Sequence, residues 1–114
     1  MSRSVLLQLA RDSIQEVLEA QRTIDKSALL QEHPLLNENI NLVVNIFIAD
    51  KLKSSYEIKE NNSSLINNII IGAKKAAFES GKVITTSEYL HSEIELVLDT
   101  PDGKISQRDA AIIS

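Results

Sequence analysis

The sequence of 114 residues contains no cysteine, which excludes thiol catalysis, a cysteine redox switch and zinc held by cysteine ligands. Glycine is also scarce. The three glycines, Gly72, Gly81 and Gly103, are isolated, so the chain lacks a glycine-rich loop that could bind phosphate. Lysine and arginine together number 12 against 16 aspartates and glutamates, giving a net charge of −4. This acidic balance disfavours nucleic acid as the main partner.

Long apolar runs are missing as well. The short run Val5-Leu6-Leu7 is soon followed by Arg11 and Asp12. The first residues therefore have neither a secretory signal pattern nor the ~20 apolar residues of a membrane helix. We expect a cytoplasmic protein with no membrane partner. The length fits one domain, residues 1–114, which buries about two-thirds of its unfolded surface and needs no disulfide.

Patterns typical of catalytic and metal sites are few. His33 and His91 are far apart, and neither has a carboxylate at a familiar metal-binding spacing. Glu93 and Glu95 could act together as acid and base, but their alternation with apolar residues favours the solvent-facing side of a strand. The serine pair 54–55 has no histidine nearby in sequence to activate a hydroxyl. The sequence thus predicts no catalytic residue, no metal and no cofactor.

The first segment with helical spacing begins near Ser4. Its opposite face is polar and includes Arg11 and Glu16, as expected for an amphipathic helix with one buried stripe. The predicted stripe comprises Leu6, Ala10, Ile14 and Val17.

A second amphipathic helix is expected from Leu65 to about Ser80, where Gly81 suits the left-handed residue that ends many helices. Gly72 in its interior costs roughly 1 kcal/mol relative to alanine. Its presence predicts that another element packs very closely there. The connector Thr23–Asn39, by contrast, has no regular pattern beyond a helical turn before Pro34.

Alternating apolar residues predict a β-hairpin built from Ile40–Ala49 and residues 52–58. A third strand is expected from about His91 to Asp99. After a turn at Thr100–Gly103, a short fourth strand starts at Lys104, although residues 106–109 also resemble a helix capping box. The order α-β-β-α-β-β predicts a two-layer α+β sandwich with amphipathic helices packed on an antiparallel sheet.

Four stretches, taken in order, resemble one known family. Leu9–Ile14 reads Leu-Ala-Arg-Asp-Ser-Ile, and Ala73–Glu79 reads Ala-Lys-Lys-Ala-Ala-Phe-Glu. Ser92–Pro101 contains Glu-Ile-Glu-Leu-Val-Leu-Asp-Thr-Pro, and Asp50–Glu57 stands where the family has a hairpin reading Gly-x-Leu-Arg-Gly-Cys-Ile-Gly. The order and spacing are similar to those of the AMMECR family, named after a human chromosomal region linked to Alport syndrome, elliptocytosis and midface hypoplasia.

The chain departs from this family in two ways. Ser54, Ser55 and Tyr56 replace the Gly-Cys-Ile stretch, so no role of that cysteine is carried over. The sequence also stops soon after the Thr-Pro pair, so we expect a short, divergent AMMECR-like domain that is shortened at its C-terminus. Prokaryotic members of the family are similar to domains associated with MEMO-type and radical-SAM proteins, which implies an accessory role.

These observations favour a non-catalytic binding or accessory module over an enzyme. The alternative is an enzyme or small-ligand-binding protein that uses a cleft at the hairpin. Its expected ligand-binding residues are Lys53, Ser54, Ser55, Tyr56 and Glu57.

Apolar side chains outside the main stripes predict an interface with a protein partner or a second copy. Phe47 lies on the less apolar face of its strand, and Ile71 and Phe78 lie away from the buried stripe of the second helix. Alternatively, Ala110–Ile113 folds back as a strand or turn and covers the same surface within one subunit.

Overall fold

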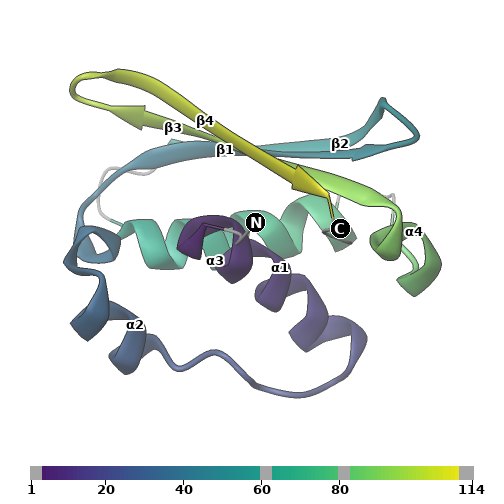
Figure 1. Ribbon diagram of the computed structural model, residues 1–114, viewed down its shortest axis with the longest axis horizontal. Coiled ribbons are helices and arrows are strands. Elements are labelled where there is room, and N and C mark those ends of the chain that lie inside the picture. Colours follow the sequence, from purple (N-terminus) through teal and green to yellow (C-terminus); the bar gives the residue numbers. More distant parts are fainter. Residues whose placement is uncertain (1–3, 60–62, 80–82, 111–114) are drawn as a thin grey trace.

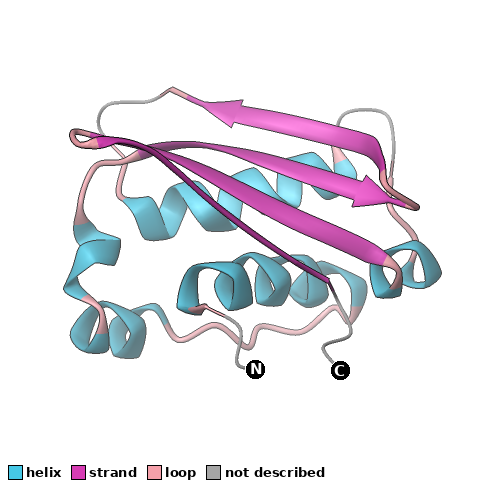
Figure 2. Cartoon of the chain, turned by 45° about the horizontal axis from the view of Figure 1, so that its top comes forward, coloured by secondary structure: helices cyan, strands magenta, loops and turns pink. Residues whose placement is uncertain are grey.

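The computed structural model describes residues 4–59, 63–79 and 83–110. Its elements are α1 (Val5–Leu18), α2 (Lys26–Glu32), the 3₁₀ helix η1 (Pro34–Asn37), β1 (Asn41–Ile48), β2 (Lys51–Ile58), α3 (Leu65–Phe78), α4 (Thr86–Leu90), β3 (Ser92–Thr100) and β4 (Gly103–Ala110). The strands form one antiparallel sheet in the order β2-β1-β3-β4 (Figure 1). Both long helices, α1 and α3, lie on the same side of this sheet (Figure 2). The predicted two-layer α+β fold is confirmed.

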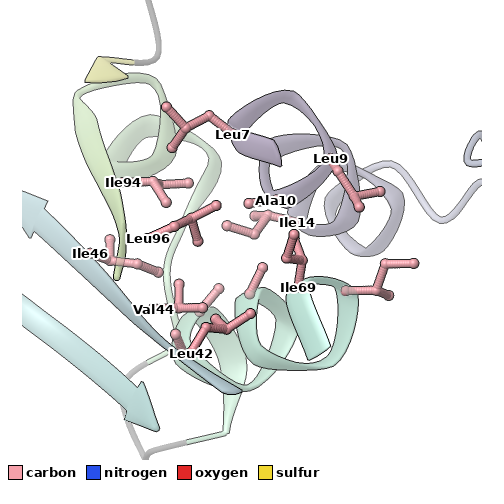
Figure 3. Close-up of a cluster of buried hydrophobic side chains, with 14 of the residues drawn as sticks. Leu7, Leu9, Ala10, Ile14, Leu42, Val44, Ile46, Ile69, Ile94 and Leu96 are labelled. Carbon is pink, nitrogen blue, oxygen red and sulfur yellow. The ribbon is translucent and has the colours of Figure 1, made fainter. Parts of the chain in front are cut away.

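The hydrophobic core lies between the sheet and the two long helices (Figure 3). Alternate residues of β1 and β3 point into it, as the period of two in the sequence predicts. The helices contribute one stripe each, because residues three and four apart share a face. The buried residues include Leu7, Ala10, Ile14, Leu42, Val44, Ile46, Leu65, Ile66, Ile69, Ala73, Ile94, Leu96 and Leu98.

Gly72 marks the closest approach of α3 to the sheet. A Cβ atom at this position would lie 3.0 Å from Val44 Cγ2 and 3.1 Å from Ile58 Cδ1. The predicted close packing is therefore confirmed, and a larger residue would fit only if the methyl groups of Val44 and Ile58 moved by a few tenths of an ångström.

The C-terminal ambiguity is decided in favour of a strand. Residues 106–109 belong to β4, which pairs along β3 from Gly103 to Ala110. Gly103 has a positive φ of 122° in the turn between them. Residues 111–113, expected to fold back, lie outside the described residues, as do Ser80 and Gly81.

Two residues of α1 differ from the prediction. Val17, expected in the buried stripe, is 46% exposed, whereas Arg11, expected on the polar face, is 1% exposed. Val17 faces an open cleft beside the segment that follows α1. Arg11 is buried because β3 begins and β4 ends beside it.

Arg11 ties the first helix to the end of the last strand. Its Nη2 donates hydrogen bonds to the backbone carbonyls of Ser92 (3.0 Å) and Asp109 (3.1 Å). Its Nη1 donates to Ser92 Oγ, and its Nη2 lies 3.3 Å from Asp109 Oδ1. The guanidinium also lies 5.3 Å from the centre of the Tyr89 ring. One buried cation thus joins α1, α4, β3 and β4.

Replacement of Arg11 is expected to destabilise the fold. Arg11→Met removes one partner of a buried charge pair and should lower the free energy of unfolding by about 3 kcal/mol or more. Arg11→Lys keeps the charge but loses the planar fork of donors, so its loss should be intermediate. Urea unfolding of both variants measures this. Wild-type stability of Arg11→Lys would contradict the clamp.

Ile69 and Ile71 provide a matched pair for testing the core. Ile69 is fully buried, whereas Ile71 on the same helix is 44% exposed. Ile69→Ala should lower the free energy of unfolding by about 2 to 5 kcal/mol, because it leaves a cavity. Ile71→Ala should cost much less. Equal midpoints in urea for the two variants would show that the orientation of α3 is wrong.

Candidate functional site

The five hairpin residues predicted to bind a ligand are divided between the two faces of the sheet. Ser54 and Tyr56 point toward α3, whereas Ser55 and Glu57 pair with Asn45 and Val43 on the opposite face. This division follows from the alternation of side chains along a strand.

Lys53 lies at an irregularity in the hairpin. The register shifts between Ile46 and Phe47, which pair with Ser54 and Leu52, so Lys53 is the extra residue of a β-bulge. Its Nζ lies 3.3 Å from Glu88 Oε2 on α4. The backbone N–H of Thr85, together with the Lys53 ammonium, lowers the pKa of Glu88.

Ser54 and Tyr56 connect the hairpin to α3. The buried Ser54 Oγ donates a hydrogen bond to the carbonyl oxygen of Ala76. The ring of Tyr56 packs against the core, with Lys75 Nζ 5.5 Å from its centre. The Ser54 hydroxyl and the Tyr56 ring therefore serve contacts within the fold.

A small groove separates β2 from α3. Tyr56, Glu57, Ile71 and Lys75 are among its lining residues, and its volume is about 150 Å³. This volume is below the ~300 Å³ at which small-molecule sites begin. The groove contains two of the five predicted residues, and ligand binding by the set stays a prediction.

The other face of the sheet is open over the described residues: α1 and α3 both pack on the opposite side (Figure 2). Val43 and Val97 are cross-strand partners at its centre, and both are half-buried. Phe47 lies further along β1 opposite Leu52, which is 56% exposed. We call this surface the open face.

Polar side chains form a continuous row across the open face. Ser55 Oγ donates to Asn45 Oδ1 (2.7 Å), and Asn45 Nδ2 donates to Glu95 Oε1 (2.9 Å). The row therefore crosses β2, β1 and β3.

Arg108 of β4 covers part of the same face. Its Nε donates to Glu93 Oε1 at 2.6 Å, and its guanidinium carbon lies 4.0 Å from the centre of the Phe47 ring. This geometry is a cation–π contact next to an ion pair. Sequence reasoning singled out Phe47 and Glu93 separately but missed Arg108, because strand registers decide which side chains meet.

The three predicted interface residues lie on different surfaces. Phe47 lies on the open face, Ile71 lies beside the small groove under β2, and Phe78 packs partly against the core. These three residues therefore do not form one continuous patch, and an interface at any of them stays a prediction.

Within residues 4–59, 63–79 and 83–110, no group of three or more His, Asp or Glu side chains is placed to hold a metal ion. No helix in the same ranges is long and apolar enough to cross a membrane. His91 lies at the surface with its Nδ1 2.9 Å from the carbonyl oxygen of Ser87.

The two serines of the hairpin should respond differently to substitution. Ser54→Ala removes a buried hydrogen bond and should lower the free energy of unfolding by about 1 kcal/mol. Ser55→Ala changes an exposed side chain and should stay within about 0.5 kcal/mol of the wild type. Thermal and urea unfolding measure both. A larger loss in Ser55→Ala would contradict the assignment of the two faces.

Among known proteins, the chain is similar to a solved structure but matches no family model and no curated protein. Among solved structures, it is similar to an uncharacterised protein, PH0010, from Pyrococcus horikoshii, with a TM-score of 0.71 and 21% sequence identity over 84% of this chain. The match covers 50% of the Pyrococcus chain, so the present chain spans about half the length of that protein. At this identity, the likeness shows a shared fold.

Proposed function

We propose that the chain is a non-catalytic binding module of the AMMECR type that docks protein through the open face of its sheet. The observation that supports this proposal is that helices cover only one face of the sheet. Helices α1 and α3 pack on one face, while the other presents Val43, Phe47 and Val97 from adjacent central strands. Apolar side chains surrounded by polar ones are typical of protein interaction surfaces.

The charges on the open face favour a second copy of the chain as the occupant. Strand β3 presents Glu93, Glu95 and Asp99, and the adjacent β4 presents Lys104 and Arg108. Two copies can pack with their open faces together, related by a two-fold axis that runs parallel to the strands. If this axis lies above the boundary between β3 and β4, each β3 lies over the partner's β4. Acidic side chains then face basic ones in both directions, as a symmetric interface requires.

The resemblance to AMMECR domains implies an accessory role for the module. Such domains are associated with MEMO-type and radical-SAM proteins, so an accessory role beside an enzyme fits a docking module. The alternative of a small-ligand enzyme at Ser54–Glu57 has weaker support, because Ser54 Oγ already donates to Ala76 and the adjoining groove is small.

Light scattering after size exclusion tests docking through the open face. The monomer mass is 12.6 kDa, and the wild type should form a dimer at high protein concentration. Val97→Asp should dissociate it, because Val97 lies on β3 beside the proposed axis and a charge there would be buried within the contact. A matched control is Ile71→Asp, which introduces a carboxylate at an apolar position on α3, outside the proposed contact.

Charge reversal tests the pairing of β3 with β4. Glu95→Lys and Arg108→Glu should each weaken the dimer, because like charges then face each other across the interface. The double variant should restore it. A monomeric wild type would overturn docking through the open face. So would a dimer that only the control Ile71→Asp dissociates.

A further inference from the structure

A large cleft lies on the side of the helices away from the sheet. It is bounded by the end of α1, the segment 20–25, the start of α2 and the middle of α3, and its volume is about 1000 Å³. In Figure 2 the segment between α1 and α2 runs along the side of the helix layer opposite the sheet. This volume is in the range of small-molecule sites. A second cleft, between α1 and α2 near His33, is less than half as large, with a volume of about 420 Å³.

Glu16 gives the cleft its shape. Its Oε2 accepts hydrogen bonds from the backbone N–H groups of Thr23 (2.8 Å) and Ile24 (3.0 Å), and its Oε1 accepts one from Lys74 Nζ (3.1 Å). The N–H of Ile24 makes the largest contribution to lowering the pKa of Glu16, with further contributions from Thr23 and Lys74. The carboxylate thus stays ionised and holds the 20–25 segment in an arch.

The second carboxylate in the cleft is also engaged within the protein. Asp25 Oδ1 accepts from the backbone N–H of Ala28 and caps α2. Both acidic side chains that line the cleft therefore bind backbone N–H groups.

The basic side chains have donors to spare. Arg22 is exposed and makes no side-chain hydrogen bond or ion pair with the described residues. Lys26 Nζ lies 3.1 Å from the neutral Asn67 Oδ1, and Lys74 uses one donor on Glu16. Three cations against two carboxylates make the lining positive, although the whole chain has a net charge of −4.

Apolar side chains form the rest of the lining. Val17 on α1 is 46% exposed, Ile24 on the connecting segment is half-buried, and Ile70 on α3 is buried. A bound molecule that covered Val17 would remove apolar surface from water. The cleft therefore combines unused cationic donors with an apolar wall.

We propose that this cleft binds a small organic anion in which a carboxylate or phosphate group is attached to an apolar body. The guanidinium of Arg22 and the ammonium groups of Lys26 and Lys74 bind the oxyanion. Guanidinium groups pair with both kinds of head group through parallel hydrogen bonds. Val17 and the half-buried Ile24 contact the apolar body. This site lies across the molecule from the open face, so it stands independently of the proposed docking function.

NMR titration of the ¹⁵N-labelled chain tests the site. The probes are hexanoate and hexyl phosphate, with acetate and inorganic phosphate as head groups alone and hexylammonium as the cationic counterpart. Shifts should concentrate at residues 16–27 and 70–74. Hexanoate or hexyl phosphate should bind more tightly than its head group alone, and hexylammonium should not bind there. Binding of hexanoate only, of hexyl phosphate only or of both identifies the head group.

Substitutions connect the binding to the named side chains. Arg22→Gln should weaken binding by about tenfold or more, because a charge-assisted hydrogen bond is lost. Lys26→Gln should also weaken it, whereas Lys51→Gln, the same change at the exposed start of β2, should leave it unaltered. Val17→Ser should weaken hexanoate binding and leave acetate unaffected. Equal binding of hexylammonium, no shifts at the cleft, or wild-type affinity in Arg22→Gln would overturn the proposal.

Discussion

The close contact between α3 and the sheet at Gly72 is the constraint on which the arrangement depends. Because a side chain is absent there, Val44 and Ile58 of the two hairpin strands approach the helix directly. The same approach allows Ser54 to reach the carbonyl of Ala76 and leaves only a small groove under β2. The surfaces proposed to bind other molecules lie elsewhere, on the open face and in the cleft beside the end of α1.

Most of the architecture could be predicted from the sequence, because side-chain periodicity reports which residues share a buried face. It gave the two helical stripes, the hairpin and the third strand, and Gly72 indicated close packing. Periodicity does not report where a neighbouring element ends. Val17 has the spacing of a core residue but lies where the helix extends beside the cleft, and Arg11 has the spacing of a surface residue but meets the end of β4.

The candidate sites were harder to predict. The separation of Ser54 from Ser55 follows from strand alternation alone, whereas the bulge at Lys53 and the contact of Arg108 with Phe47 depend on strand register. The cleft depends on a carboxylate of α1 that binds backbone N–H groups of a segment without periodicity. The periodicity of the sequence does not predict a contact of this kind. The AMMECR resemblance, which rests on four short stretches, stays a prediction beside the structural likeness to the Pyrococcus protein.

The clamp at Arg11 also has a consequence for the time course of folding. Its partner Asp109 is 98 positions away, so the contact closes a loop that includes almost the whole chain. During synthesis from the N-terminus, α1 and the hairpin emerge long before β4, and a guanidinium that must finally be buried stays hydrated in the meantime. Long-range contacts of this kind raise the contact order and slow folding. Strand β4 can therefore pair with β3 and bind Arg11 only after the rest of the sheet has been synthesised.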